Sequence, residues 1–237
     1  HSEQTKLIAS KSINIVTEKP MATSYKDGLS MVKKCEDYNV KLFVVKQNRY
    51  NKTIQILKRA IDEKRFGNIK LIHINVFWTR PQSYYDKAEW RGTKKFDGGA
   101  LMNQASHYVD FLDWLFGPVR TIHCMAQTSR DIEVEDTAVL NIGWDNGLIG
   151  SMSVTMLTYP SNLEGSVTVI GETGSVKVGG NAANKIENWI FKDSKDYDKE
   201  IKNISYDTSS VYGFGHESFY ENIIEVFEGK SLPLTDG

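Results

Sequence analysis

The stretch from Lys70 to Trp78 limits most strongly what this chain can fold into. Its apolar residues fall on every second position, at Ile72, Ile74, Val76 and Trp78. Side chains of an extended strand point alternately to its two faces, so this spacing places all four on one face. Further strand-like runs follow at residues 121–128, 136–144, 148–157, 165–170 and 174–178. These runs predict a large sheet, which we expect to be mostly antiparallel.

One hairpin of this sheet can be located from its turn. The sequence Trp144-Asp145-Asn146-Gly147-Leu148 lies between two of the runs, and Asn-Gly supplies the positive φ angles of a tight turn. The second strand alternates apolar residues with hydroxyl residues, as in Met152 and Val154 against Ser151 and Ser153. One face of the sheet should be covered by helices and the other left open. A helix over Tyr50–Arg65, with Ile54, Leu57 and Ile61 on one side, is a candidate cover.

The first 48 residues follow a different rhythm, that of strand, helix and strand. A β-rich run at Ser12–Val16 is followed by apolar residues at helical spacing from Tyr25 to Cys35, and then by a second run at Lys41–Val45. Short connections between such elements are typical of a parallel βαβ unit in a doubly wound sheet. Two strands are too few for a complete sheet of that kind, and His1–Ala9 suggests part of a preceding helix. We expect two domains, residues 1–48 and 49–237.

Composition removes several classes of function. The 237 residues carry a formal net charge of −1, with 40% hydrophobic and 25% charged residues, which is typical of a soluble globular protein without a basic surface for nucleic acid. No apolar run approaches the roughly 20 residues of a membrane span. The two cysteines, Cys35 and Cys124, have neither metal-ligand spacing nor the density of a disulfide scaffold. A cytoplasmic protein is expected.

Two polar clusters follow the N-terminal strands. Glu18-Lys19-Pro20 comes directly after the first strand and Lys46-Gln47-Asn48-Arg49 directly after the second. Ligands of α/β sheets bind at the carboxyl ends of strands, and proline restricts the backbone next to Lys19. From composition alone an ordinary surface turn is favoured for the first cluster, and it explains the second about as well as a site does.

The segment from Trp78 to Thr93 is rich in tryptophan, tyrosine and arginine. It is longer than most connections, and long loops of this composition often bind ligands. Residues 181–210 are polar, and the charge run within them predicts a solvated loop or sheet edge without a chemical role.

A helix that begins with polar residues is the remaining candidate. Asp97-Gly98-Gly99 precedes Asn103, and His107 and Asp110 then lie three residues apart on one helix face. A metal site would need a further ligand that the neighbourhood does not offer, so no metal is expected. A general base oriented by Asp110 fits the pair, while a hydrogen-bonded structural histidine is the alternative.

Taken together, these clusters resemble the glucose-fructose oxidoreductase and inositol dehydrogenase family of NAD(P)-dependent sugar dehydrogenases. The family carries Glu-Lys-Pro at the end of a Rossmann strand and, further on, a glycine pair leading to His-x-x-Asp on a helix. Here these motifs are Glu18-Lys19-Pro20 and Gly98-Gly99 followed by His107-Tyr108-Val109-Asp110. The resemblance implies an α/β and α+β fold: the remnant of a Rossmann domain, then a large, mostly antiparallel open sheet with helices on one face.

Within the family the chain is similar to the bacterial UDP-N-acetylglucosaminuronate 3-dehydrogenases, through segments such as "VKQNRYN", "GALMNQASHYVDFLDWLFGPV" and "SMSVTMLTYPSNLEGSVTVIGE". The implied activity is NAD-dependent oxidation of the C3 hydroxyl of a UDP-sugar acid for surface polysaccharide, such as lipopolysaccharide. The implied partners are the UDP-sugar and, through the open sheet, a second copy or three further copies of the chain. Other family members act on a free sugar or a polyol, and a non-catalytic oligomerisation module is a third possibility.

The resemblance also implies roles for individual residues. The catalytic residues are Lys19, His107 and Asp110. The residues that contact the substrate are Arg49, Tyr84, Tyr85, Asn103, Tyr159 and Asn162. The residues that contact NAD are Glu18, Lys19, Gln47, Asn48, Trp90 and Arg91. The family's Gly-rich phosphate loop and its closing helix are not found in these 237 residues, so we expect a fragment without turnover of its own.

Overall fold

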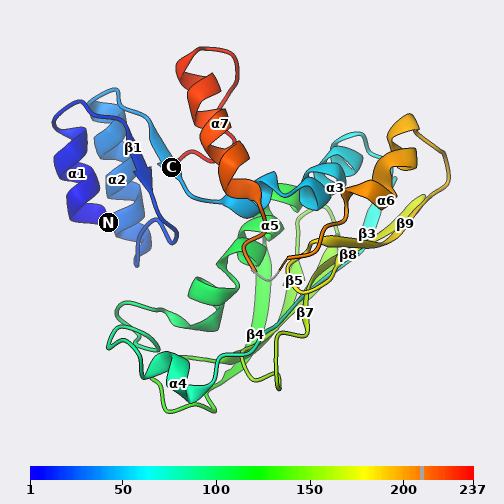
Figure 1. Ribbon diagram of the computed structural model, residues 1–237, viewed down its shortest axis with the longest axis horizontal. Coiled ribbons are helices and arrows are strands. Elements are labelled where there is room, and N and C mark those ends of the chain that lie inside the picture. Colours follow the sequence, from blue (N-terminus) through cyan, green and yellow to red (C-terminus); the bar gives the residue numbers. More distant parts are fainter. Residues whose placement is uncertain (209–210) are drawn as a thin grey trace. The chain divides into compact units, whose positions relative to one another are not determined.

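The computed structural model describes residues 1–208 and 211–237 and divides into two compact units (Figure 1). Unit 1 comprises His1–Tyr50 and Phe214–Gly237, and unit 2 comprises Asn51–Gly213. The predicted division after residue 48 lies close to this boundary. The C-terminal residues differ, because the prediction assigned them to the second domain whereas they pack with the first 50 residues.

Unit 1 is built on two short parallel strands. Its elements are α1 (Ser2–Ala9), β1 (Ile15–Thr17), α2 (Tyr25–Asp37), β2 (Leu42–Val44), a 3₁₀ turn (Gln47–Tyr50) and α7 (Gly215–Phe227). β1 pairs with β2 in register Ile15 to Leu42, and the hydroxyl of Ser24 caps α2 by accepting from the Asp27 N–H at 3.1 Å. The predicted parallel strand-helix-strand order is confirmed, and its assignment to a Rossmann domain stays a prediction.

Unit 2 contains a seven-stranded sheet within the described residues. The strands are β3 (Ile69–Phe77), β4 (Thr121–Gln127), β5 (Thr137–Gly143), β6 (Ile149–Thr155), β7 (Glu164–Gly171), β8 (Gly174–Gly179) and β9 (Lys185–Phe191), in the order β4-β5-β6-β3-β7-β8-β9. The helical elements are α3 (Lys52–Asp62), α4 (Gln82–Tyr85), a π-helical turn (Ala100–Gln104), α5 (Ser106–Phe116), a 3₁₀ turn (Asp196–Glu200) and α6 (Ile201–Ile204). The Trp144–Leu148 hairpin is confirmed, with Trp144 N–H donating to the Leu148 carbonyl at 3.0 Å.

The sheet is mostly antiparallel, as expected, with one exception at its centre. β3 pairs antiparallel with β7 but parallel with β6. The connection between two parallel strands must cross over the sheet, and here it carries α4, the π-helical turn, α5, β4 and β5. The predicted candidate helix with His107 therefore lies in this crossover.

The two faces of the sheet differ as predicted. The inner face carries Ile72, Ile74, Met152 and Val154, which are fully or almost fully buried against α3 and α5, and these helices lie together on that side (Figure 1). The outer face is the side that carries His73, Asn75, Val139, Ser151 and Thr168. Val139 is 48% exposed there. The outer face is thus open in the single chain.

The charge run within residues 181–210 was predicted to form a solvated loop or a sheet edge, and residues 192–195 of this run form an exposed loop directly after β9. β9 extends the sheet, and α6 follows it; residues 209–210 lie outside the described part of the chain. Among the exposed charges of "KDSKDYDKE", Asp198 forms an ion pair with the buried Arg65 side chain, and this contact fixes the segment. In the described residues no helix has the length and apolarity to cross a membrane, and both cysteines are free.

Candidate active site

The two polar clusters of unit 1 lie at the same end of its two strands. Thr17, the last residue of β1, pairs with Val44, the last residue of β2, so Glu18-Lys19 and Gln47-Asn48 both follow the carboxyl edge of the sheet. The Glu18 carboxylate accepts from the Lys19 N–H at 3.2 Å, and the Lys19–Pro20 peptide is cis. The structure brings together the residues predicted for the catalytic lysine and the nicotinamide end of the cofactor.

The buried side chain of Asn48 indicates that this edge of the sheet fits a bound cofactor. Its side chain is buried, and its Oδ1 has no hydrogen-bond partner within the described residues. Leaving a buried acceptor unpaired costs about 1–3 kcal/mol, which a donor on a bound molecule would remove. The carboxamide N–H₂ of NAD is a donor of this kind, so the residues at this edge fit the nicotinamide end of the cofactor.

Arg49, predicted to contact the substrate, has a partner inside unit 1. Its Nη1 donates to the Leu234 carbonyl at 2.8 Å. The neighbouring Tyr50 hydroxyl donates to Asn222 Oδ1 of α7 at 2.9 Å. The 3₁₀ turn after β2 therefore holds the C-terminal residues of the chain, a contact across nearly two hundred residues that local sequence patterns do not reveal.

In unit 2 the glycine pair forms a sharp turn before the candidate helix. Gly98 and Gly99 have φ angles of +75° and +94°, a region that disfavours side chains. A Cβ on Gly99 would collide with the Glu135 carboxylate. That carboxylate accepts from the Leu101 N–H at 3.0 Å and the Glu135 carbonyl accepts from the Ala100 N–H at 3.0 Å. Glu135 thus satisfies the first donors of the π-helical turn.

A separate turn precedes the predicted helix that carries His107 and Asp110. Residues 100–104 form a π-helical turn, and α5 begins only at Ser106. The Ala105 N–H closes the π-helical turn by donating to the Ala100 carbonyl at 2.8 Å, and π-helical turns are frequent at functional sites. His107 is 3% exposed, next to Tyr108 in the core, and Asp110 is half-buried on the same helix. That Asp110 orients His107 stays a prediction.

Asn103 is held by a carboxylate that the sequence did not mark as a site residue. Its Nδ2 donates to Oδ1 of Asp97, whose Oδ2 accepts from the Gly92 N–H at 2.7 Å. Asp97 is 6% exposed. The loop and the helix start are therefore joined through one buried acidic side chain.

The aromatic loop gathers two arginines around Tyr84. The guanidinium carbon of Arg91 lies 4.2 Å from the centre of the Tyr84 ring and that of Arg80 lies 5.3 Å from it. Gln104 bridges them, donating to the Tyr84 hydroxyl and accepting from Arg80 Nε, both at 3.0 Å. Within the described residues neither guanidinium forms an ion pair. This arrangement can bind carboxylate or phosphate oxygens.

The other predicted residues of unit 2 differ in accessibility. Tyr159 is 95% exposed and Trp90 44% exposed. Asn162 has its Oδ1 engaged by the Thr79 N–H at 2.8 Å, which fixes the loop before β7. Tyr85 is packed inside the unit, where burial and the charges of Asp97 and Asp136 raise its pKa to about 12, so it stays protonated.

Residues 54–177 match the model of the GFO/IDH/MocA C-terminal domain. The chain belongs to the GFO/IDH/MocA family.

Two solved structures of this family are similar to the whole chain. The WlbA dehydrogenase of Chromobacterium violaceum, in complex with NADH and UDP-GlcNAcA, is 54% identical with a TM-score of 0.93, and the chain covers 67% of it. The Bordetella pertussis WlbA dehydrogenase, in complex with the same two molecules, is 53% identical with a TM-score of 0.95 and is covered to 68%. Levoglucosan dehydrogenase of Pseudarthrobacter phenanthrenivorans is 21% identical over 201 residues, 74% of this chain. The chain spans about half the length of the curated relatives that it matches, 52% for levoglucosan dehydrogenase.

Family motifs do not account for every candidate residue. Asp97, Arg80 and Gln104 were missed because each acts through a contact that is distant in sequence or made by a residue type common on surfaces. Arg80 comes directly after Trp78-Thr79 at the end of β3, and an arginine at a strand end was the signal that could have identified it. In the described part of the chain no group of three His, Cys, Asp or Glu side chains could hold a metal ion.

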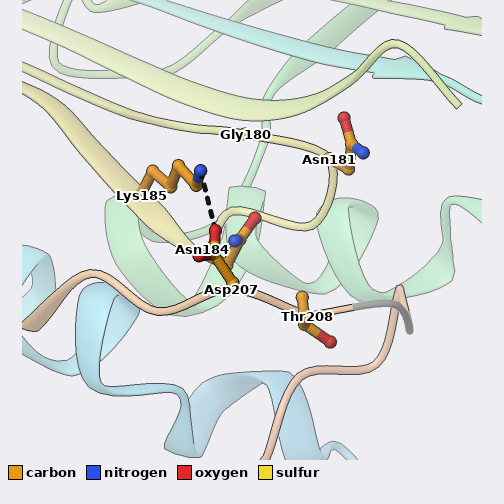
Figure 2. A pocket seen from close by; sticks show the side chains of 6 residues that line it. All are labelled: Gly180, Asn181, Asn184, Lys185, Asp207 and Thr208. Carbon is orange, nitrogen blue, oxygen red and sulfur yellow. Dashed lines mark ion pairs between the residues drawn. The ribbon is translucent and has the colours of Figure 1, made fainter.

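A separate cavity of about 400 Å³ lies near β9 and is lined by Gly180, Asn181, Asn184, Lys185, Asp207 and Thr208 (Figure 2). Lys185 and Asp207 form an ion pair at 2.9 Å across it. Asn184 donates to the Tyr206 carbonyl and accepts from the Ala182 N–H. These interactions hold residues 206–208 against the sheet. None of the candidate active-site residues lines this cavity.

Proposed function

We propose that this protein catalyses NAD-dependent oxidation of the C3 hydroxyl of a UDP-N-acetylglucosaminuronate-type sugar. The observation that carries the proposal is the identity of 53–54% over the whole chain with two dehydrogenases solved with NADH and UDP-GlcNAcA. The polar residues at the strand ends of unit 1 and the arginine-tyrosine cluster of unit 2 support it. They offer contacts for a nicotinamide and for an anionic sugar nucleotide, respectively.

In the proposed mechanism His107 is the general base. A neutral imidazole accepts the proton of the C3 hydroxyl, and histidine suits this step near neutral pH. The Lys19 ammonium donates a hydrogen bond to the same oxygen and stabilises the negative charge that develops on it. NAD, when bound, supplies the hydride acceptor. Asp110 orients His107, and Asn103 hydrogen-bonds the sugar.

The remaining residues are proposed to position the two molecules. Glu18, Gln47 and Asn48 contact the nicotinamide end of NAD, with Trp90 and Arg91 also near the cofactor. Arg49, Tyr84, Tyr85, Tyr159 and Asn162 contact the sugar or the diphosphate. The exposed side chain of Tyr159 and the guanidinium groups beside Tyr84 support this assignment better than the buried Tyr85 does.

We also propose that the chain forms a homodimer or homotetramer through the outer face of its sheet. The open β-surface, with exposed Val139 and Ile149 among serine and threonine side chains, would be covered by a second copy. Two free cysteines are compatible with the cytoplasm. The product ketone would serve the synthesis of surface polysaccharide, including lipopolysaccharide.

NADH absorbance after addition of substrate tests the proposed activity. We expect the protein as encoded, with any flanking segments, to reduce NAD with UDP-GlcNAcA but not with UDP-GlcNAc, inositol or glucose. Turnover of inositol or glucose alone would instead assign a free-sugar or polyol dehydrogenase. Absence of turnover with every sugar, together with no effect of NAD on thermal stability, would support a non-catalytic module. The same assay on residues 1–237 tests the expectation that this chain alone has no turnover.

A further inference from the structure

The contact between Asp97 and Asn103 fixes the orientation of the Asn103 side-chain amide. A buried carboxylate is unfavourable unless it is hydrogen-bonded, and Asp97 accepts one bond on each oxygen. Its Oδ2 accepts from the Gly92 N–H at 2.7 Å and its Oδ1 accepts from Asn103 Nδ2. Within the described chain these two N–H groups are the hydrogen-bond partners of the Asp97 carboxylate.

The chemistry of this contact determines which way the Asn103 amide faces. An ionised carboxylate can only accept, so the amide N–H₂ must point to Asp97 and the carbonyl Oδ1 must point to the other side. The backbone is also fixed, because Ser106 Oγ donates to the Asn103 carbonyl at 2.9 Å. An asparagine without such a neighbour can present either its oxygen or its nitrogen to a ligand. At Asn103 that choice is removed.

We propose that Asp97 is a positioning residue that makes Asn103 a hydrogen-bond acceptor for a sugar hydroxyl of the substrate. The inference rests on the proposed function, since it concerns the sugar contact assigned there to Asn103. Asp97 itself does not touch the substrate. Its role is to select a ligand that donates at this point, as a hydroxyl does, over one that only accepts.

The decisive experiment exchanges the two side chains. In Asp97→Asn the single amide oxygen cannot serve both Gly92 N–H and Asn103 N–H₂, and in Asn103→Asp two carboxylates face each other. In the double variant, Asn at 97 accepts from Gly92 and donates to Asp at 103, which keeps an oxygen towards the substrate. We expect each single variant to raise KM for UDP-GlcNAcA at least about tenfold, the equivalent of one lost hydrogen bond, with KM for NAD unchanged. The exchange should restore the KM for UDP-GlcNAcA to within about threefold of the wild-type value.

A matched control and a measurement without turnover keep the test independent. Asp86→Asn removes the same charge from an exposed position of the same loop and should leave both KM values unchanged. In NMR spectra of the wild type, the side-chain N–H₂ of Asn103 should exchange with water more slowly than that of exposed Asn146. A wild-type KM in Asp97→Asn, no recovery in the exchanged variant, or fast exchange at Asn103 would overturn the inference. If the wild type does not oxidise UDP-GlcNAcA, the proposed function fails while the exchange measurement still decides the contact.

Discussion

Arg65 and Asp198 form a bidentate ion pair although they lie 133 residues apart in the sequence. Arg65 Nη1 and Nη2 donate to the two oxygens of Asp198 at 2.7 and 2.8 Å, and the Arg65 side chain is 2% exposed. The Trp189 indole N–H donates to the same carboxylate at 2.8 Å. The pair links the segment that follows β9 to the turn that follows α3.

Asp198→Asn is expected to destabilise unit 2 by about 3 kcal/mol, because it leaves the Arg65 guanidinium buried without its counter-charge. Urea unfolding followed by tryptophan fluorescence measures the loss. Asp196→Asn, which changes a fully exposed carboxylate two residues away, should change stability by less than about 0.5 kcal/mol. Equal effects of the two variants would contradict a stabilising role for the pair.

The same pair gives stability a pH dependence with a definite sign. The Arg65 guanidinium holds the pKa of Asp198 well below its ordinary value, in spite of partial burial. A carboxyl with a lowered folded-state pKa stabilises fully above its unfolded value, near about 4, and this contribution is lost as the pH falls through the folded-state pKa. The stability difference between wild type and Asp198→Asn should therefore be largest at neutral pH and shrink below about pH 4. A difference that is constant down to pH 2 would exclude this origin.

Gly99→Ala is expected to cost more stability than Gly117→Ala. The two glycines share a backbone conformation, with φ and ψ of 94° and −178° at Gly99 and 84° and −179° at Gly117, so the conformational cost of about 1–3 kcal/mol is common to both. A Cβ at Gly117 meets nothing within 4 Å, whereas at Gly99 it meets the Glu135 carboxylate. The excess loss, about 1–3 kcal/mol from overpacking, measures that collision. Equal losses in urea unfolding would mean that Glu135 moves away without cost.

His107→Gln is expected to lower kcat for UDP-GlcNAcA oxidation by about 10²–10⁴-fold, the usual contribution of a general base. Stopped-assay measurements over a range of substrate concentrations would separate kcat from KM. His123→Gln is the matched control, since His123 lies on the exposed edge strand β4. A kcat within threefold of the wild-type value in His107→Gln would assign His107 a structural role instead.

Val139→Glu is expected to dissociate the proposed oligomer, because it buries a charge in an interface formed by the outer face. Sedimentation velocity should show a species of lower mass than the wild type. Ile224→Glu introduces the same charge at an exposed position of α7 and should leave the mass unchanged. An unaltered mass in Val139→Glu, or a monomeric wild type, would refute this interface.

Tyr108→Phe is expected to raise the free energy of unfolding by about 1 kcal/mol. The Tyr108 hydroxyl is fully buried and has no partner within the described residues, and burial raises its pKa. Trp78→Phe, by contrast, removes the indole N–H that donates to the Asn181 carbonyl at 2.9 Å and should be destabilising. Thermal unfolding of both variants distinguishes a surplus polar group from a necessary one.

Sequence patterns were most informative where residues close together in the sequence determine the local structure. The alternation in β3 and β6 and the Asn-Gly turn predicted strands, their inner face and a hairpin, all of which the structure contains. Other features depend on residues that meet only after folding. They are the parallel pairing of β3 with β6, the ion pair of Asp198 with Arg65 and the hydrogen bond from Asn103 to Asp97. The motif residues of the candidate site could be identified, but the side chains that orient them could not.

The position of β3 has a consequence for the order of events on the ribosome. β3 ends at Phe77, but its two neighbours are β6, which begins at Ile149, and β7, which begins at Glu164. The apolar central strand must therefore leave the exit tunnel long before either partner exists, and such non-local pairing is slow and exposes aggregation-prone surface. During synthesis β3 has neither of its partner strands until more than seventy further residues have been translated, whereas α3, which precedes it in the chain, is already made.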